Sequence, residues 1–485
     1  MRIAIVHYHL QPGGVTRIIE HAVNALADQP IVLAVLTGEE TPLKISVETR
    51  VVPRLAYEER RPTGTPSLLA NDLMIAARDA LGGMPDVWHI HNHALGKNLL
   101  LPEALAWMVD NEQKFLFQLH DFVEDGRPFL YQRLINQLGE KNRSRLSALL
   151  YPVAPQIHYA VLNQRDFNFF KKAGCIHECL HLIPNPVELE VDHLPAVDTV
   201  NTKDPLWLYP TRAIRRKNLG EFLLWATVCE PGSRFATTLG PENPQEQLHY
   251  RRWQQLAAEL KLPIDFEVGR DSHMSFFDLL HSAHAVVTTS IAEGFGMAYL
   301  EPWLAGQPIY GRDLSEITQG FRKDGIILDG LYERLNIPLH WIGRVALVKK
   351  VKNAIRQRDQ AYGKSLEPDA LEQFMNHWVS NEQIDFGCLE EDMQIKVIRR
   401  LHSSQEARAE LVPARLAAPG ISNEVISGNQ SVLEEKYGLA SYGSKLMNIY
   451  RQILSSGSQS KESLDIDKLL NCFLAPERLS LLRID

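Results

Sequence analysis

Short apolar, β-branched runs alternate along the chain with longer segments in which apolar residues recur at helical spacing. The first series of runs covers residues 3–6, 31–36, 87–90, 115–119, 159–162 and 181–183, and the second covers 206–209, 235–239, 264–268, 285–289 and 308–310. Alternation of this kind predicts parallel sheets covered by helices. We therefore expect an α/β protein with two doubly wound domains, and ligands in a cleft between the carboxyl ends of their strands.

The domain boundaries follow from changes in this pattern. A polar, proline-containing stretch separates the two series, and residues beyond 331 show helical patterns without a clear strand series. The expected parts are a Rossmann-like domain (1–190), a linker (191–204), a second Rossmann-like domain (205–330), a mostly helical insertion (331–425), a terminal helix (426–456) and a linker with an amphipathic tail (457–485). The strand over 1–7 precedes a predicted helix over 17–26.

Composition narrows the class of protein. A chain of 485 residues with 45% hydrophobic residues favours a folded, multidomain protein. The net charge of −8, without long basic runs, argues against general nucleic-acid binding. No apolar run suits a signal peptide or a membrane helix, and five cysteines without a CxxC pair fit a reducing compartment, so we expect a cytoplasmic enzyme.

Two carboxylates, Glu293 and Glu301, lie eight residues apart around a glycine-rich turn that follows a β-branched run. Such a strand-to-helix turn exposes backbone amides that attract phosphate. If residues 294–301 are helical, the carboxylates are about 12 Å apart along the axis and about 80° apart around it. This spacing predicts an extended ligand with phosphates in its middle.

Two further turns follow strands. Arg212 and Lys217 lie after the first strand of the second domain, where their charges could neutralise a diphosphate, although a solvated basic turn is the alternative. Gly13 and Gly14 follow the first strand of the chain. They allow a ligand to approach the backbone closely, or they form an ordinary tight turn.

Histidines gather at predicted strand ends. His120 follows the strand over 115–119, where it could hydrogen-bond a sugar hydroxyl. The clusters over 89–93 and 175–181 have alternate spacing that could support a metal site, and hence a metal-dependent hydrolase. Zinc-site spacings such as HExxH are absent, so the other interpretation is that the clusters belong to a cleft rim and a partly buried strand.

In order along the chain, Gly13-Gly14, His91, His120, the Arg212 and Lys217 pair and the Glu293 and Glu301 pair resemble the motifs of retaining GT-B glycosyltransferases of family 4. The last two pairs together are highly specific. The resemblance covers residues 1 to about 320 and the terminal helix, which in a GT-B fold crosses back to the first domain. Asn218 replaces a common glycine, Pro302-Trp303 replaces a small pair, and the insertion is larger than usual.

The resemblance implies roles for individual residues. Arg212 and Lys217 would hold the nucleotide diphosphate, Glu301 the ribose and Glu293 the transferred sugar. Further implied donor contacts are Gly13, Gly14, His120, Val268 near the nucleobase, and the turn formed by Gly294, Phe295, Gly296, Met297 and Ala298. His91 and Asn92 are candidates on the acceptor side.

The implied activity is retaining, metal-independent transfer of a hexosyl unit from a UDP-, GDP- or ADP-sugar to a hydroxyl group of a small soluble sugar or polar metabolite. A front-face attack, in which the leaving phosphate accepts the proton, is the favoured mechanism. Related alternatives are a nucleotide-sugar epimerase, a sugar phosphorylase and a catalytically silent scaffold. The insertion or the tail could also mediate a homo-oligomer.

Overall fold

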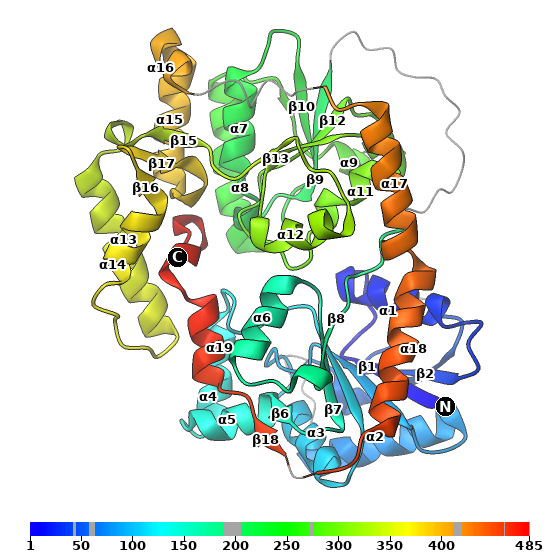
Figure 1. Cartoon of the computed structure of the whole chain (residues 1–485). Coiled ribbons are helices and arrows are strands. Elements are labelled where there is room, and N and C mark those ends of the chain that lie inside the picture. Colours follow the sequence, from blue (N-terminus) through cyan, green and yellow to red (C-terminus); the bar gives the residue numbers. More distant parts are fainter. Residues whose placement is uncertain are drawn as a thin grey trace. The chain divides into compact units, whose positions relative to one another are not determined.

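The structure is a computed structural model that describes residues 1–41, 45–57, 64–188, 205–271, 275–411, 420–459 and 461–484. It divides into two compact units, each assembled from separate parts of the chain (Figure 1). Unit 1 comprises Met1–Pro186, Ala361–Lys364 and Lys436–Ala475, and unit 2 comprises Val187–Gln360, Ser365–Glu435 and Pro476–Asp485. The linker predicted over 191–204 lies outside the described residues.

Unit 1 contains a seven-stranded sheet in the order β3-β2-β1-β4-β5-β7-β8, with every neighbouring pair parallel. The strands are β1 (Arg2–His7), β2 (Val32–Thr37), β3 (Glu48–Val51), β4 (Val87–His91), β5 (Phe115–Leu119), β7 (Ile157–Val161) and β8 (Leu180–Leu182). The helices are α1 (Gly14–Ala25), α2 (Pro66–Leu81), α3 (Leu100–Asp110), α4 (Pro128–Gln137), α5 (Arg143–Leu150), α6 (Gln164–Lys172), α18 (Leu439–Ser455) and α19 (Ile466–Phe473). A small antiparallel pair joins β6 (Pro152–Val153) to β18 (Glu462–Ser463).

Alternate residues of the unit 1 strands face two helical layers, as the pleat of a buried strand requires. Ile3 and Ile5 of β1 pack in one apolar core with residues of α1 and α18, whereas Ala4 and Val6 pack in the other with residues of α2, α3 and α19. Figure 1 shows α18, in orange, beside the blue α1. Helices from the end of the chain therefore complete both cores of the first sheet.

Unit 2 contains a six-stranded parallel sheet in the order β11-β10-β9-β12-β13-β14. The strands are β9 (Leu206–Arg212), β10 (Arg234–Leu239), β11 (Ile264–Asp265), β12 (Ala285–Thr288), β13 (Ile309–Arg312) and β14 (Leu331–Tyr332). The helices up to residue 324 are α7 (Leu219–Val228), α8 (Pro244–Glu259), α9 (Val268–Asp271), α10 (Phe276–Ser282), α11 (Glu301–Leu304) and α12 (Ser315–Asp324). The predicted α/β class with doubly wound parallel sheets is confirmed.

The strand order reverses once in each sheet. In unit 1 the reversal lies between β1 and β4, and in unit 2 it lies between β9 and β12. At such a point the connections after the two strands leave toward opposite faces of the sheet and open a crevice at the carboxyl ends. Most of the candidate residues lie on loops that follow these same strands, whereas His120 follows β5 and Val268 follows β11.

The region after β14 adds both helices and strands to unit 2. Its elements are β15 (Asn336–Pro338), α13 (Arg344–Ala361), α14 (Ala370–Trp378), β16 (Val379–Ser380), β17 (Gln383–Asp385), α15 (Glu391–Ser403), α16 (Gln405–Glu410) and α17 (Asn423–Tyr437). The three strands form an antiparallel sheet in the order β15-β17-β16. These strands were not predicted, because two or three residues are too few to show an alternating pattern.

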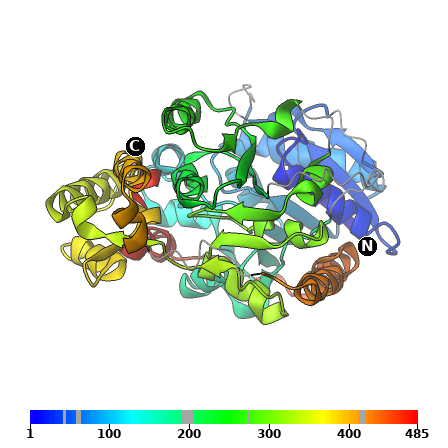
Figure 2. The ribbon, with the colours of Figure 1, turned by 90° about the horizontal axis from the view of Figure 1, so that it is seen from above.

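This added region joins the core of unit 2. Helices α13 to α16, yellow to orange in Figures 1 and 2, lie together beside the green helices α7 and α8, and α15 packs on α7. Apolar residues of α13, α14 and α15 belong to the same core as those of α7 and α8. The region is therefore part of unit 2 and is not a separate folding unit.

A buried ion cluster fixes the added region to the second sheet. Arg312, at the end of β13, places its guanidinium 2.5 Å from Glu221 of α7 and 2.8 Å from Asp385 of β17. Tyr332 donates a hydrogen bond of 2.7 Å to Glu221, and Asp385 accepts one of 2.9 Å from the amide of Leu335. One cation thus bridges two carboxylates from different layers.

One other expectation needed correction. The terminal helix predicted over 426–456 is two helices, α17 and α18, because Gly438 adopts an extended conformation between them. Side chains of α17 bond to unit 2, where Asn429 donates to the Ile327 carbonyl and Gln430 to the Trp303 carbonyl, each at 2.9 Å. The chain passes into unit 1 at residue 436, just before this break.

Replacing Arg312 with methionine should strongly destabilise unit 2, because two buried carboxylates would lose their cation. We expect the free energy of unfolding, measured by urea titration, to fall by about 3–5 kcal/mol. The control is Arg344→Met, which breaks an ion pair with Glu382 whose side chains are 55% and 77% exposed, and this change should have little effect. Equal losses in both variants would contradict the bridging role of Arg312.

Candidate functional site

Two loops of unit 2 meet at the reversal point of its sheet. The first follows β9 and contains the short 3-10 helix η4 (Arg215–Lys217), and the second follows β12 and spans residues 289–296. Because β9 and β12 are paired neighbours, their carboxyl ends lie about 5 Å apart. Sheet topology therefore brings together two loops that are about 75 residues apart in sequence.

Hydrogen bonds connect the two loops directly. The amide of Ile291 donates to the carbonyl of Arg216 at 2.9 Å. The hydroxyl of Thr289 lies 3.0 Å from the carbonyl oxygens of both Lys217 and Asn218. The β-branched residues that follow β12 thus fix the backbone of the basic turn.

The conformation of Asn218 explains its position after the lysine. Its φ and ψ angles of 51° and 55° are left-handed, which glycine and asparagine tolerate best. Its side chain donates to Glu221 at 2.8 Å and accepts from Gln394 at 2.9 Å. The departure from the usual glycine therefore preserves the turn and links it to α7 and α15.

Glu293 forms ion pairs with two cations of the first loop. One carboxylate oxygen accepts from Nζ of Lys217, and the other lies 3.0 Å from Nη1 of Arg216. Burial alone would raise the pKa of Glu293, but the charges of Lys217 and Arg216 outweigh it and lower the pKa to about 2. Glu293 is therefore an ionised carboxylate at neutral pH although only 9% of it is exposed.

Arg216 is a site residue that the sequence reasoning missed. Its Nη1 also donates to the carbonyl of Ala292 at 2.7 Å. Arg212, which the spacing predicted as the partner of Lys217, pairs instead with Glu242 at 2.7 Å, with side chains 47% and 76% exposed. The only signal for Arg216 was its position next to Lys217 in a basic run, because side-chain directions in a 3-10 turn cannot be read from spacing.

Exposed ion pairs such as that of Arg212 contribute little, about 0–1 kcal/mol. The Arg212 guanidinium at the end of β9 is therefore held only weakly by Glu242 and can turn toward a ligand. The side chains of Arg216 and Lys217 in η4, in contrast, are held by the buried carboxylate of Glu293.

The turn after Glu293 is less helical than predicted. Residues 294–296 precede a 3-10 turn, η5 (Met297–Tyr299), and Glu301 is the first residue of α11. The separation of 12 Å and 80°, which assumed a helix over 294–301, is therefore wrong. Glu301 nevertheless lies close enough to Lys217 for their charges to interact. Burial lowers the pKa of Lys217, and the negative charges of Glu293 and Glu301 both oppose that change.

Two residues of this turn have structural reasons for their identity. Gly296 has a φ angle of 95°, and a Cβ atom there would lie 2.9 Å from the ring of Tyr299, so the position requires glycine. Phe295 is 5% exposed and packs edge-on against Phe321 of α12, with 5.5 Å between ring centroids. The buried side chain of Phe295 anchors the turn, so that Phe295 can contact a ligand only through its backbone.

The strand predicted over 264–268 is shorter than expected. Strand β11 stops at Asp265, and Val268 begins the short helix α9, which packs at the end of β10. Glu267, with a φ angle of 60°, turns the chain between them. Val268 still lies at the carboxyl edge of the second sheet, but on a helical turn.

In unit 1, the three candidate residues after β4 and β5 form one buried group. Nδ1 of His91 lies 2.8 Å from Nε2 of His120, and the two rings stack with centroids 5.2 Å apart. The side-chain oxygen of Asn92 accepts from the amides of His120 and Asp121 at 2.7 and 3.2 Å. His91 and Asn92 are 1% and 2% exposed, so their observed contacts support His120 and leave almost no surface for an acceptor.

A single proton is shared between His91 and His120. Burial lowers the pKa of His120 to about 4 and that of His91 well below its ordinary value, so both imidazoles are neutral at pH 7. Only one of the two nitrogens can carry the bridging hydrogen, and Nε2 of His91 is buried without a partner. His120 is the partly exposed member of the pair and can present its other nitrogen to a ligand.

Gly13 and Gly14 have no internal requirement for glycine. Gly13 is extended, and a Cβ atom at Gly13 or Gly14 would meet nothing closer than 3.8 Å. Helix α1 begins at Gly14, three residues earlier than predicted, and has no side-chain cap. Its first amides and the open space above the glycines are consistent with close approach of a ligand.

The histidine clusters do not form a metal centre in the described part of the chain, where no group of three or more His, Cys, Asp or Glu side chains has suitable geometry. Ring nitrogens of His89 bond to Tyr450 at 2.8 Å and Gln118 at 2.9 Å, and His93 bonds to a backbone carbonyl. In the second cluster, His181 bonds to His158 at 2.7 Å. These contacts engage at least one ring nitrogen of each of these histidines, whereas Nδ1 of His93 is buried without a partner.

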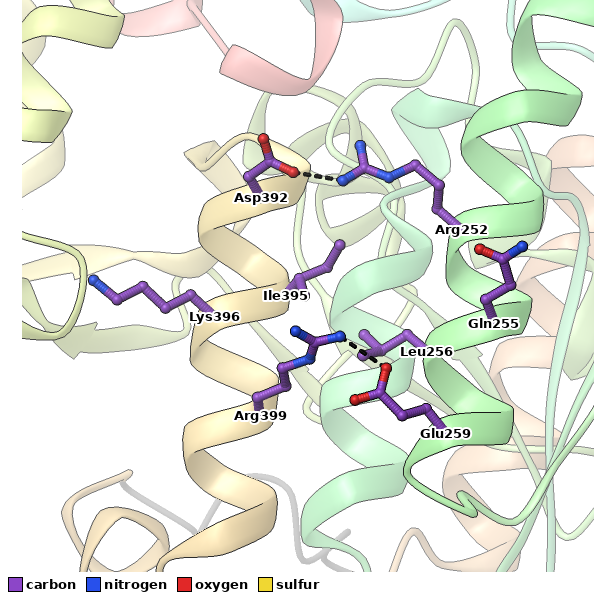
Figure 3. A pocket seen from close by; sticks show the side chains of 8 residues that line it. All are labelled: Arg252, Gln255, Leu256, Glu259, Asp392, Ile395, Lys396 and Arg399. Carbon is purple, nitrogen blue, oxygen red and sulfur yellow. Dashed lines mark hydrogen bonds and ion pairs between the residues drawn. The ribbon is translucent and has the colours of Figure 1, made fainter.

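A separate groove lies between α8 and α15 (Figure 3). Four of its charged side chains are paired across the groove, Arg252 with Asp392 at 2.5 Å and Arg399 with Glu259 at 2.7 Å. None of the predicted site residues lines it. These pairs link the added region to α8, and Lys396, the remaining charged residue of the lining, points away from them.

No known protein-family profile matches the sequence. The chain is 24% identical over 494 aligned positions to mannosylglucosyl-3-phosphoglycerate synthase of Petrotoga mobilis, and the match covers 94% of this chain and 92% of that protein. Within the described residues, no helix has both the length and the apolar character needed to cross a bilayer.

Solved structures with the same fold are GT-B glycosyltransferases. HepE of Anabaena in complex with UDP matches with a TM-score of 0.53 and 12% identity, covering 92% of this chain and 99% of that one. Sucrose-phosphate synthase of Thermosynechococcus elongatus matches with a TM-score of 0.52 and 16% identity, covering 94% and 99%. The chain has the GT-B fold, as predicted.

Unit 1 should lose stability as the pH falls from about 6.5 to about 4. Burial lowers the pKa of His93 to about 4 and of His89 to about 3, whereas unfolded histidine titrates near 6.5, so protons bind the unfolded state first. Each such histidine should remove about 1.4 kcal/mol per pH unit, measured by urea titration across this range. His93→Gln should flatten the dependence, and replacement of the exposed His177 by asparagine should not. An unchanged slope in His93→Gln would contradict this assignment.

Proposed function

We propose that this protein is a retaining glycosyltransferase that moves a hexosyl unit from a nucleotide-diphosphate sugar to a hydroxyl acceptor. The observation that carries the proposal is the ionised Glu293 carboxylate between Lys217 and Arg216 at the reversal point of the second sheet. The GT-B fold and the relative named as a mannosylglucosyl-3-phosphoglycerate synthase support it.

The charges of the site suit a diphosphate leaving group. Lys217 and Arg216 share the carboxylate of Glu293, and Arg212 at the end of β9 pairs with the exposed Glu242. When Arg212 turns from Glu242 toward a ligand, all three cations face a diphosphate that departs with two negative charges. In this proposal the three cations stabilise the charge that develops on the diphosphate as the sugar–phosphate bond breaks.

The remaining residues have proposed roles on either side of the diphosphate. Glu293 contacts the transferred sugar, and Glu301 binds the ribose. Amides of the turn over 294–298 hold sugar and phosphate oxygens, and Val268 lies near the nucleobase. In unit 1, His120 contacts the donor sugar and the Gly13-Gly14 loop approaches the phosphates. His91 and Asn92 fix the ring and the backbone of His120.

For the acceptor, we propose a small polar metabolite. The name of the relative describes a product that contains two hexoses and a phosphoglycerate, which favours an acceptor of this hydrophilic, anionic kind. For stereochemistry, we propose front-face attack, in which the leaving phosphate oxygen accepts the acceptor proton. Because Glu293 is held by two cations, it is a weak nucleophile, and this supports a route without a glutamyl intermediate.

A panel of nucleotides tests donor binding. UDP, GDP and ADP, each with its glucose or mannose conjugate, should be compared by thermal unfolding of the full chain. One nucleotide class should raise the melting temperature, because a ligand that binds only the native state stabilises it. The increase should persist in EDTA, since the proposed site uses side-chain cations. The absence of any increase at millimolar concentrations would overturn the proposed donor class.

Two substitutions separate binding from chemistry. Lys217→Met should weaken binding of the selected nucleoside diphosphate by about 10–100-fold, because it removes a buried cation. Glu293→Gln should bind the same nucleotide at least as tightly, because Arg216 and Lys217 lose their competing carboxylate, while kcat falls on the order of 100-fold. Calorimetry measures the first effect and steady-state transfer kinetics the second.

Full transfer activity in Glu293→Gln would show that the carboxylate has no part in the reaction. The matched control is Glu242→Gln, since Glu242 pairs with Arg212 at the exposed edge of the same site and should change both quantities only slightly. The anomeric configuration of the product, read by proton NMR, tests retention. A product formed without acceptor would instead indicate an epimerase.

A further inference from the structure

The C-terminal segment 476–484 belongs to a different unit from the helix that precedes it. Helix α19 contributes Leu469, Leu470 and Phe473 to a core of unit 1, whereas the chain from Pro476 onward groups with unit 2. The sequence predicts only a linker with an amphipathic tail over 457–485. Its last part consists of two 3-10 turns, η9 (Pro476–Arg478) and η10 (Leu481–Arg483).

Apolar burial and one ion pair attach the segment to unit 2. Leu479, Leu481 and Leu482 are 2%, 6% and 4% exposed, and Leu479 and Leu481 belong to the core of unit 2. Turn η9 packs against α14, and Arg478 pairs with Glu316 in the first turn of α12. Three buried leucines within four positions indicate a docked segment and not a loosely attached end.

The segment docks against the turn that carries the site cations. Turn η10 contacts η4, and Leu482 lines one narrow cavity together with Ile214, Arg215 and Asn218, which flank or belong to η4. Arg215 itself is tied to α8, since its amide donates to Glu246 at 2.7 Å. The tail thus reaches the same turn as α8 and the loop after β12.

A three-residue 3-10 turn cannot hold itself rigidly, because it makes few internal hydrogen bonds. Side chains that bind a diphosphate must be held to within about 0.5 Å of their productive positions. The cations of η4 therefore depend on neighbouring packing, and Leu482 supplies an apolar part of it. Removing this side chain would enlarge the cavity beside the turn.

We propose that the C-terminal segment 476–484 is a positioning element for the donor site, and that Leu482 is its positioning residue for Arg216 and Lys217. The inference rests on the proposed role of η4 in diphosphate binding. In this role, turn η10 holds η4 in position by packing against it and does not contact the ligand.

The test compares Leu482→Ala with Leu347→Ala in the full-length chain. Leu347, on α13, is a fully buried leucine of the core of unit 2 and is not among the residues around η4. Both variants should melt at lower temperature. Only Leu482→Ala should weaken binding of the nucleoside diphosphate, by about tenfold, and the volume-conserving Leu482→Met should restore it.

Hydrogen exchange of the ligand-free protein separates this inference from the proposed function. Amides over 215–218 should exchange faster in Leu482→Ala than in Leu347→Ala, whether or not the protein binds nucleotides. Equal exchange in the two variants, or equal nucleotide affinity where the parent binds, would overturn the positioning role. Faster exchange in a protein that binds no nucleotide would uphold the packing role and overturn the donor site alone.

Discussion

The candidate donor site depends on one electrostatic arrangement, the buried Glu293 carboxylate held by Lys217 and Arg216. A single buried carboxylate would take up a proton, and a single buried ammonium would lose one, because burial disfavours either charge. Together the charges of the two cations offset the burial of Glu293, which remains ionised at neutral pH. The adjacency of β9 and β12 makes this arrangement attainable, and the bonds from Thr289 and Ile291 keep it in place.

A second ion cluster attaches the added region to the parallel sheet of unit 2. Arg312 bridges Glu221 and Asp385 with almost no exposure to solvent, and so connects the parallel sheet to the antiparallel strands of the added region. Glu221 also accepts a hydrogen bond from Asn218, the residue that ends the basic turn. Glu221 therefore links the Arg312 cluster to the basic turn of the candidate donor site, and through this link the added region helps to hold that turn.

Unit 1 uses neutral polar groups where unit 2 uses charges. His91 and His120 share a hydrogen bond, and His89 bonds to Tyr450 of α18. Burial keeps these rings uncharged at neutral pH. A helix from near the end of the chain thus helps to order the strand ends of the first sheet.

The sequence alone determined the parallel sheets, their approximate strands and the two residues, Lys217 and Glu293, that the structure brings together. Strand periodicity and the polar residues that follow strands are local properties, and sheet topology turns them into neighbours. Only the tertiary structure decided that Arg216 and not Arg212 pairs with Glu293, that Glu301 begins a helix, and that Leu482 packs beside η4. These features depend on side-chain direction, left-handed turns and docking between distant segments, none of which leaves a periodic signal in the chain.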